Sequence, residues 1–153
     1  MSKERLRGCA EGGVSLFIGT ADANGRPACC RAVALTSRDD YDTVTIYAPV
    51  ATAQETVANL ATTRRIAIGL SRVPDHTSLQ IKGLMRAVRL ARADEAELVE
   101  RQLGDFAARL AELGLPRHVT RRINHWPAFA IDVSVEQVFD QTPGPKAGAA
   151  IPS

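Results

Sequence analysis

Short runs of apolar and β-branched residues recur along the chain, and polar turns separate them. Six of these runs have the length and alternation of β-strands. They cover residues 14–21, 27–37, 43–48, 65–70, 78–90 and 128–139. Between the first two runs, Asn24 and Gly25 tolerate the backbone angles of a tight hairpin, and Pro27 suits the start of the returning strand because it lacks an N–H. The pattern predicts a mainly β, antiparallel fold.

A different periodicity follows the fifth run. Over residues 94–113, apolar residues recur at steps of three and four, which is typical of a helix with one apolar face. They are Val99, Leu103, Phe106, Leu110 and Leu113. Asp94 stands as the cap in a capping-box pattern at the start of this helix. Thr52 stands in a second such pattern, which predicts a shorter helix over residues 52–60.

Six antiparallel strands with flanking helices suit a small closed barrel, in which closure removes exposed strand edges. The chain has 153 residues, the usual size of one domain, and no linker divides it. We therefore expect a single domain over residues 1–140. Residues 141–153 contain Pro143, Pro145 and a high proportion of turn-forming residues, and we expect them to form an extended C-terminal tail.

Composition narrows the classes of function. A formal net charge of +2 is too small to indicate a nucleic-acid partner, and no run approaches the ~20 apolar residues of a membrane span. Residues 1–8 have no apolar signal core, and the three cysteines give no disulfide framework, so we expect a cytoplasmic protein with reduced thiols. The three histidines lie far apart without acidic or cysteine neighbours at ligand spacing, and no metal site is predicted.

Three positions on two predicted strands, and one helix start, are candidates for ligand binding. Alternation on the fifth run places Gln80 and Lys82 opposite the core, where Lys82 points to solvent or to a bound anion. Gly83, next in the chain, is a candidate bulge or point of close approach. Arg31 offers a planar set of donors that fits phosphate, although it could equally cover apolar surface or pair with an aspartate. The helix start at Thr52 offers free N–H groups to an anion, or caps itself without a ligand.

Three segments, in this order and at this spacing, resemble the flavin-binding split-barrel family that includes pyridoxamine 5'-phosphate oxidase. They are the hairpin of residues 18–33, the pair Asn59-Leu60 followed by residues 65–69, and the segment Leu79-Gln-Ile-Lys-Gly83. The resemblance implies a six-stranded antiparallel split barrel that binds flavin mononucleotide (FMN). It also implies a homodimer with the cofactor between its subunits and an oxidoreductase activity on a small molecule that the sequence does not identify.

The resemblance further implies which residues contact the cofactor. They are Arg31, Ala32, Val33, Thr52, Gln54, Gln80, Lys82 and Trp126. The chain departs from the family pattern at Ala53-Gln54, where Arg and Lys would be expected beside the cofactor phosphate. Phosphate binding there should be weaker, or another cation such as Lys82, Arg64 or Arg65 should compensate.

Alternatives to an FMN enzyme stay open at this point. The same fold could hold a deazaflavin or haem, or it could serve as a non-catalytic binding or stress-response module. The altered Ala53-Gln54 pair favours these alternatives, whereas Arg31 and the segment Gln80-Ile-Lys82 favour FMN. Trp126, the single tryptophan, could instead belong to the core or to an interface.

Overall fold

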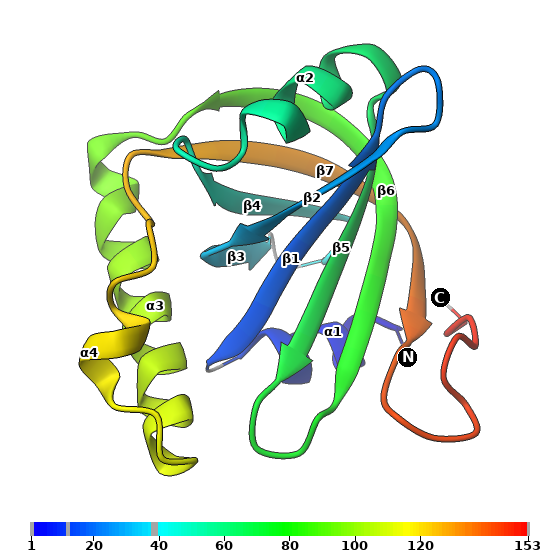
Figure 1. Ribbon diagram of the computed structural model, residues 1–153. Coiled ribbons are helices and arrows are strands. Elements are labelled where there is room, and N and C mark those ends of the chain that lie inside the picture. Colours follow the sequence, from blue (N-terminus) through cyan, green and yellow to red (C-terminus); the bar gives the residue numbers. More distant parts are fainter. Residues whose placement is uncertain (1, 12, 38–39, 153) are drawn as a thin grey trace.

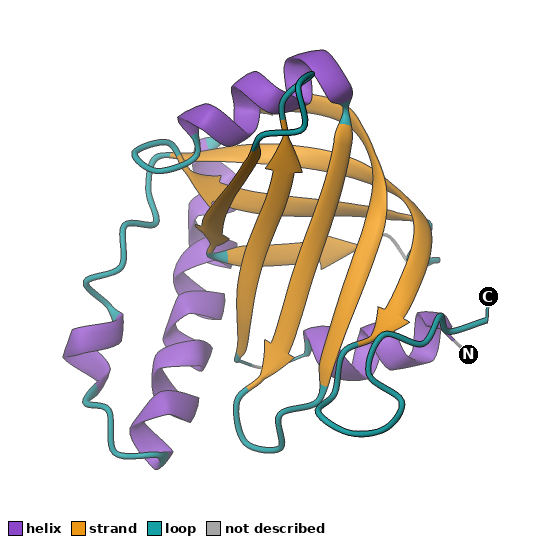
Figure 2. Ribbon diagram, turned by 45° about the vertical axis from the view of Figure 1, so that its right-hand side comes forward, coloured by secondary structure: helices purple, strands orange, loops and turns teal. Residues whose placement is uncertain are grey.

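The structure is a computed structural model that describes residues 2–11, 13–37 and 40–152. Within these residues, seven strands form one antiparallel sheet in the order β2-β1-β5-β6-β7-β4-β3. The strands are β1 (Val14–Ala21), β2 (Pro27–Ala32), β3 (Ala34–Ser37), β4 (Thr43–Pro49), β5 (Arg65–Arg72), β6 (Ser78–Leu90) and β7 (Ala128–Asp140). The two end strands, β2 and β3, are consecutive in the chain, so the sheet curls round on itself as a split barrel (Figures 1 and 2).

The mainly β, antiparallel split-barrel class is confirmed, but the predicted number of six strands was wrong. Residues 27–37 are not one strand, because the chain breaks at Val33. The Val33 N–H donates to the Tyr47 carbonyl at 2.9 Å, and Ala34 is the register partner of Tyr47. Two residues thus oppose one, as in a β-bulge, and the bend lets β2 pair with β1 while β3 pairs with β4.

Helices cover both ends and one side of the barrel. They are α1 (Ser2–Ala10), α2 (Gln54–Thr63), the short 3-10 helix η1 (Ala93–Glu95), α3 (Ala96–Glu112) and α4 (Arg117–Thr120). In Figure 1, α2 lies over one end of the barrel, α1 lies across the other, and α3 stands beside β3 with α4 against it. Helix α1 was not predicted, because its buried apolar residues, Leu6 and Cys9, are too few to show a helical period.

Helix α3 is fixed to the barrel at the edge of β3. The side-chain amide of Gln102 accepts from the Leu35 N–H at 2.9 Å and donates to the Leu35 carbonyl at 2.8 Å. It thereby satisfies backbone groups that an edge strand would otherwise leave open. Of the predicted apolar face, Val99, Leu103 and Phe106 are buried, but Leu113 is 64% exposed and does not belong to the buried face.

The starts of both predicted helices need correction. Helix α2 begins at Gln54, its cap is Ala53, and Thr52 lies exposed outside it. Ala53 is fully buried and belongs to the core cluster of the barrel, which fixes the chain at this position. Asp94 is likewise not a cap: the carboxylate of Glu95 accepts the Arg92 N–H at 2.7 Å at the start of η1.

The barrel interior follows the predicted alternation. Its fully buried side chains include Leu16, Ile18, Ile46, Ile68, Leu70, Leu79, Ile81 and Ile131. On β6, Leu79 and Ile81 face this core, and Lys82 is exposed. The register between β6 and β7 shifts between Lys82 and Gly83, where a Cβ on Gly83 would lie 2.2 Å from the Ser134 carbonyl oxygen. The predicted bulge and close approach at Gly83 are therefore confirmed.

The C-terminal segment turns back along β7 instead of extending away from the barrel. Ala150 pairs with Phe139, and the Ile151 N–H donates to the Val138 carbonyl at 2.8 Å. Asp140, at the end of β7, pairs with Arg5 of α1 at 2.6 Å, and this hydrogen bond lowers the pKa of Asp140 to about 2.

None of the described helices has the length and apolarity needed to cross a membrane.

Candidate functional site

Two rows of outward-pointing residues cross the face of the barrel formed by β2, β1, β5, β6 and β7. Strand register gives one row as Arg31, Phe17, Gly69, Gln80 and Phe139. The second row is Cys29, Gly19, Ala67, Lys82 and Gln137. Since Ile18, Ile68 and Ile81 alternate with these residues and are fully buried, both rows lie on the outside of the barrel.

The centre of this outer face consists of very small residues, namely Gly19, Ala67 and Gly69. A Cβ on Gly69 would meet nothing within 4 Å, and one on Gly19 would only touch the Ala67 Cβ at 4.0 Å. Neither glycine has a positive φ, so the fold itself requires glycine at neither position. Glycine weakens a strand and often marks the close approach of a ligand or of another backbone. The flat centre of the face therefore indicates that something packs against it.

Two hollows lie along β1, β5 and β6 over this flat centre. One, of about 280 Å³, contains Ala67, Lys82 and Glu136. The other, of about 270 Å³, contains Gly69 and Gln80, two residues further along the same strands. We call the two hollows together the trough.

The two ends of the trough differ in chemistry. At one end, the Lys82 Nζ lies 4.8 Å from the centroid of the Phe139 ring, and Arg65 pairs with Glu136 at 3.2 Å. At the other end the polar side chains are neutral: Ser15, Ser71, Ser78, Gln80 and Gln141. The trough thus combines a flat floor with a cationic end and an end of hydroxyls and amides.

Arg31 lies at the border of the trough, beyond Phe17. Its guanidinium carbon is 4.6 Å from the centroid of the Phe17 ring and 5.8 Å from that of Phe106 on α3. Its Nη1 donates to the Ser15 Oγ at 3.4 Å. Arg31 therefore covers apolar surface, as one of its sequence-based alternatives stated. The aromatic contacts also hold a cation in a fixed place beside the trough.

The other predicted residues lie elsewhere. Ala32 and Val33 are buried residues, 4% and 7% exposed, and neither is part of the trough. Three predicted residues are exposed: Thr52 on the loop that follows β4, Gln54 at the first position of α2, and Trp126 on the loop that precedes β7. The Val50 N–H joins these loops by donating to the Pro127 carbonyl at 2.9 Å. The trough contains Gln80 and Lys82 but none of these three exposed residues.

Sequence reasoning missed the floor and walls of the trough. The residues concerned are Phe17, Gly19, Ala67 and Gly69. One available signal was glycine inside a strand pattern, at Gly19 and Gly69, which often marks a close approach. Which of these residues become neighbours depends on strand pairing, which no local pattern specifies.

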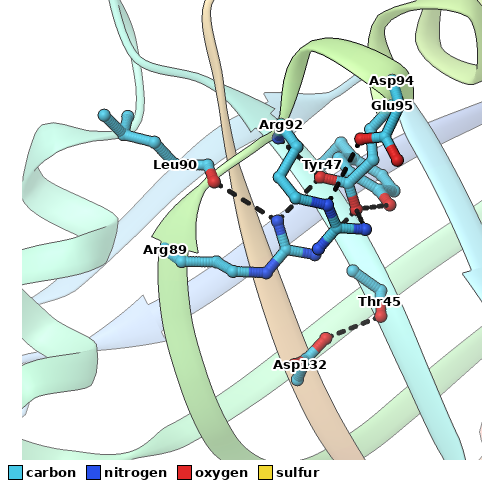
Figure 3. Close-up of polar contacts among 8 residues, drawn as sticks. All are labelled: Thr45, Tyr47, Arg89, Leu90, Arg92, Asp94, Glu95 and Asp132. Carbon is cyan, nitrogen blue, oxygen red and sulfur yellow. Dashed lines mark hydrogen bonds and ion pairs between the residues drawn. The ribbon is translucent and has the colours of Figure 1, made fainter.

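A separate polar cluster at the start of α3 is structural (Figure 3). The Glu95 carboxylate accepts two bonds from Arg89, both at 2.7 Å, and one from the Tyr47 hydroxyl at 2.9 Å. The bonds from Arg89 lower the pKa of Glu95 to about 2, and burial together with Glu95 raises the pKa of Tyr47 to about 12. Since every group is paired inside the protein, the cluster ties α3 to β4 and β6 and offers no free acid or base.

Neither family models nor curated proteins match this chain. Solved structures do. A candidate pyridoxamine 5'-phosphate oxidase from Lactobacillus delbrueckii is 16% identical, with a TM-score of 0.55 over 91% of this chain and 93% of that one. An FMN-binding protein from Syntrophomonas wolfei is 14% identical, with a TM-score of 0.58 over 91% and 87%. An F420 reductase is 12% identical, with a TM-score of 0.59 over 86% and 94%.

Proposed function

Because the chain has the fold of pyridoxamine 5'-phosphate oxidase-like proteins, we propose that it binds FMN in the trough, between two copies of itself, and oxidises or reduces a small molecule. One observation carries the proposal: the floor of Gly19, Ala67 and Gly69 is flat although the fold requires neither glycine. A planar ring system fits against such a floor, and a side chain at Gly69 would occupy the same space.

The residues of the trough would bind and orient the flavin. The floor contacts one face of the ring, Phe17 borders it, and the Gln80 amide can donate to and accept from polar ring atoms. Lys82 and Arg31 supply positive charge for an anionic cofactor. When bound, FMN supplies the electron transfer itself, while the protein supplies position and electrostatics.

A second copy would complete the site. The trough is open to solvent on its outer side, so a single chain cannot enclose a ring and keep water from it. A two-fold partner supplies the missing wall for both copies at once. We place Thr52, Gln54 and Trp126, which are exposed and outside the trough, on the partner-facing side of this shared site. We also propose that the protein is cytoplasmic, as expected from its sequence.

Titration of flavin fluorescence with the protein tests binding directly. The wild-type protein should quench FMN at micromolar concentration, and Gly69→Val should weaken binding by about 10-fold or more, because its methyl groups occupy the floor. Thr43→Val, on β4 away from the trough, is the control and should bind like the wild type. FMN fluorescence that stays unchanged at high micromolar protein would refute the proposed function.

Light scattering after size-exclusion chromatography tests the shared site. We expect a dimer for the wild type. Phe17→Asp should give a folded monomer with at least about 10-fold weaker FMN binding, because it places a charge in the proposed contact between the two copies; Phe17 is 41% exposed in the single chain. Circular dichroism checks folding. A monomeric wild type that binds FMN tightly would contradict the shared site and leave the trough intact.

A deazaflavin is the second candidate ligand. It has a tricyclic ring of the same shape, and one similar structure is an F420 reductase. Haem and a role without turnover remain further alternatives on the same fold. The absorption spectrum of the purified protein, with mass spectrometry of whatever denaturation releases, separates flavin, deazaflavin and haem. If no reductant reduces the bound flavin and no small-molecule oxidant reoxidises it, the protein is a binding module without turnover.

A further inference from the structure

We infer that Lys82 on β6, and not the start of α2, binds the anionic end of the ligand in the trough. This inference rests on the proposed function and fixes the direction of the ligand. The resemblance to flavin-binding proteins places the cofactor phosphate at the helix start that follows Thr52. The structure of this chain disfavours phosphate binding at that helix start and favours it at the cationic end of the trough.

The start of α2 is less suited than Lys82 to hold a phosphate. Its cap, Ala53, is fully buried among the core residues, so a longer basic side chain has no room there. The N–H groups of Thr52 and Ala53 already donate to the Pro49 carbonyl at 3.1 and 3.0 Å. The charged residue in the first turn is Glu55, which opposes an anion.

Lys82, in contrast, is a cation whose donors are available. In the described part of the chain it takes part in no ion pair, whereas Arg65 in the same hollow is paired with Glu136. The contact between Lys82 and the Phe139 ring positions the ammonium group without using its N–H donors. Arg64, next to Arg65, donates its guanidinium N–H groups to a backbone carbonyl of β6 at 3.0 and 3.2 Å and is not part of the trough.

The opposite end of the trough fixes the orientation. Ser78 and Lys82 are four residues apart on β6, a distance of about 13 Å along a strand. The Ser71 and Ser78 hydroxyls hydrogen-bond at 2.7 Å and face the ring end with Gln80. A ligand with a polar aromatic ring and an anionic tail therefore lies with its ring over Gly69 and its tail at Lys82.

The ratio of the dissociation constants of riboflavin and FMN isolates the contribution of the phosphate, because the two molecules share the ring and the sugar chain. We expect Lys82→Gln to weaken FMN binding by about 10- to 100-fold, the loss of one charge-assisted hydrogen bond, with riboflavin unchanged. Glu136→Gln should strengthen FMN binding by about 3- to 5-fold, because it releases Arg65 from its ion pair. Thr52→Ala tests the rival phosphate site at α2: it should change the binding of riboflavin and of FMN by the same factor and so leave the ratio unchanged. Arg86→Gln, a cation outside the trough, is the control and should also leave the ratio unchanged.

The outcomes separate this inference from the proposed function. A wild-type protein that binds riboflavin and FMN equally, or a ratio that falls in Thr52→Ala and not in Lys82→Gln, overturns the Lys82 site while flavin binding stands. Equal losses of FMN affinity in Lys82→Gln and Arg86→Gln also overturn it, since they indicate that FMN responds to the overall positive charge and not to one residue. If the wild type quenches neither flavin, the proposed function fails, and the inference fails with it.

Discussion

Replacing Gly83 with alanine is expected to lower the free energy of unfolding by about 3 kcal/mol or more. The new Cβ would lie 2.2 Å from the Ser134 carbonyl oxygen and 3.0 Å from the Val133 Cγ1. The nearer atom belongs to the backbone of β7, so it cannot turn away as a flexible side chain can, and overpacked cores commonly lose 1–3 kcal/mol, sometimes more. Urea denaturation followed by circular dichroism measures the change.

Gly69→Ala is the matched control, since it is also a glycine inside a strand of the same barrel. Its Cβ would meet nothing within 4 Å, so we expect no loss of stability, and a gain of about 0.5 kcal/mol from the reduced freedom of the unfolded chain. The pair separates a glycine that the fold needs from one that it does not. Equal destabilisation by the two substitutions would contradict our account of both sites.

Replacing Glu95 with glutamine is expected to destabilise the protein by about 2–3 kcal/mol at pH 7. The carboxylate accepts the two bonds from Arg89, and a neutral amide leaves that guanidinium without its counter-charge. Loss of a fully buried ion pair would cost more stability. Here the Arg89 side chain is 35% exposed, so water partly solvates the guanidinium that loses its partner. Asp94→Asn, which changes an exposed neighbouring carboxylate, should cost less than about 0.5 kcal/mol.

The same substitution should remove part of the pH dependence of stability. The pKa of Glu95 is lowered from 4.5 to about 2 in the folded protein, mainly by Arg89. Its contribution is therefore complete above the unfolded pKa and is lost as the pH falls through the folded pKa. Allowing for solvent screening of Arg89, we expect the wild type to lose about 2 kcal/mol more than Glu95→Gln between pH 5.5 and pH 2.

Urea denaturation at a series of pH values measures this difference. The comparison with Glu95→Gln is necessary because Asp140, whose pKa is also lowered to about 2, contributes in the same pH range. Parallel pH profiles for the two proteins would show that Glu95 is not held as the structure places it.

Local patterns in the sequence determined where most strands lie and which way their side chains point. On β6, alternation alone separated Leu79 and Ile81 from Gln80 and Lys82, and the structure buries the first pair and not the second. Gly83 could be identified as a bulge or a point of close approach because a glycine inside a strand commonly marks one of these two features. Such features depend on neighbours in the chain, so they can be read from it.

The tertiary structure decided where the long second run breaks and where α2 begins. Val33 opposes Tyr47 because the sheet must pair at both of its ends, β2 with β1 and β3 with β4. Thr52 and Glu55 form a valid capping pattern, yet burial of Ala53 against the barrel places the helix start later. In both cases a contact distant in sequence outweighs a local preference.

The candidate site shows the same division. The sequence alone singled out Arg31, Gln80 and Lys82 as outward-pointing polar residues, and they do lie on one face of the barrel. Only the pairing of β1 with β5, and of β5 with β6, placed Gly19, Ala67 and Gly69 together as a flat floor between them. Side-chain direction along a strand is a local property of the chain, whereas adjacency across a sheet arises only when distant segments pair.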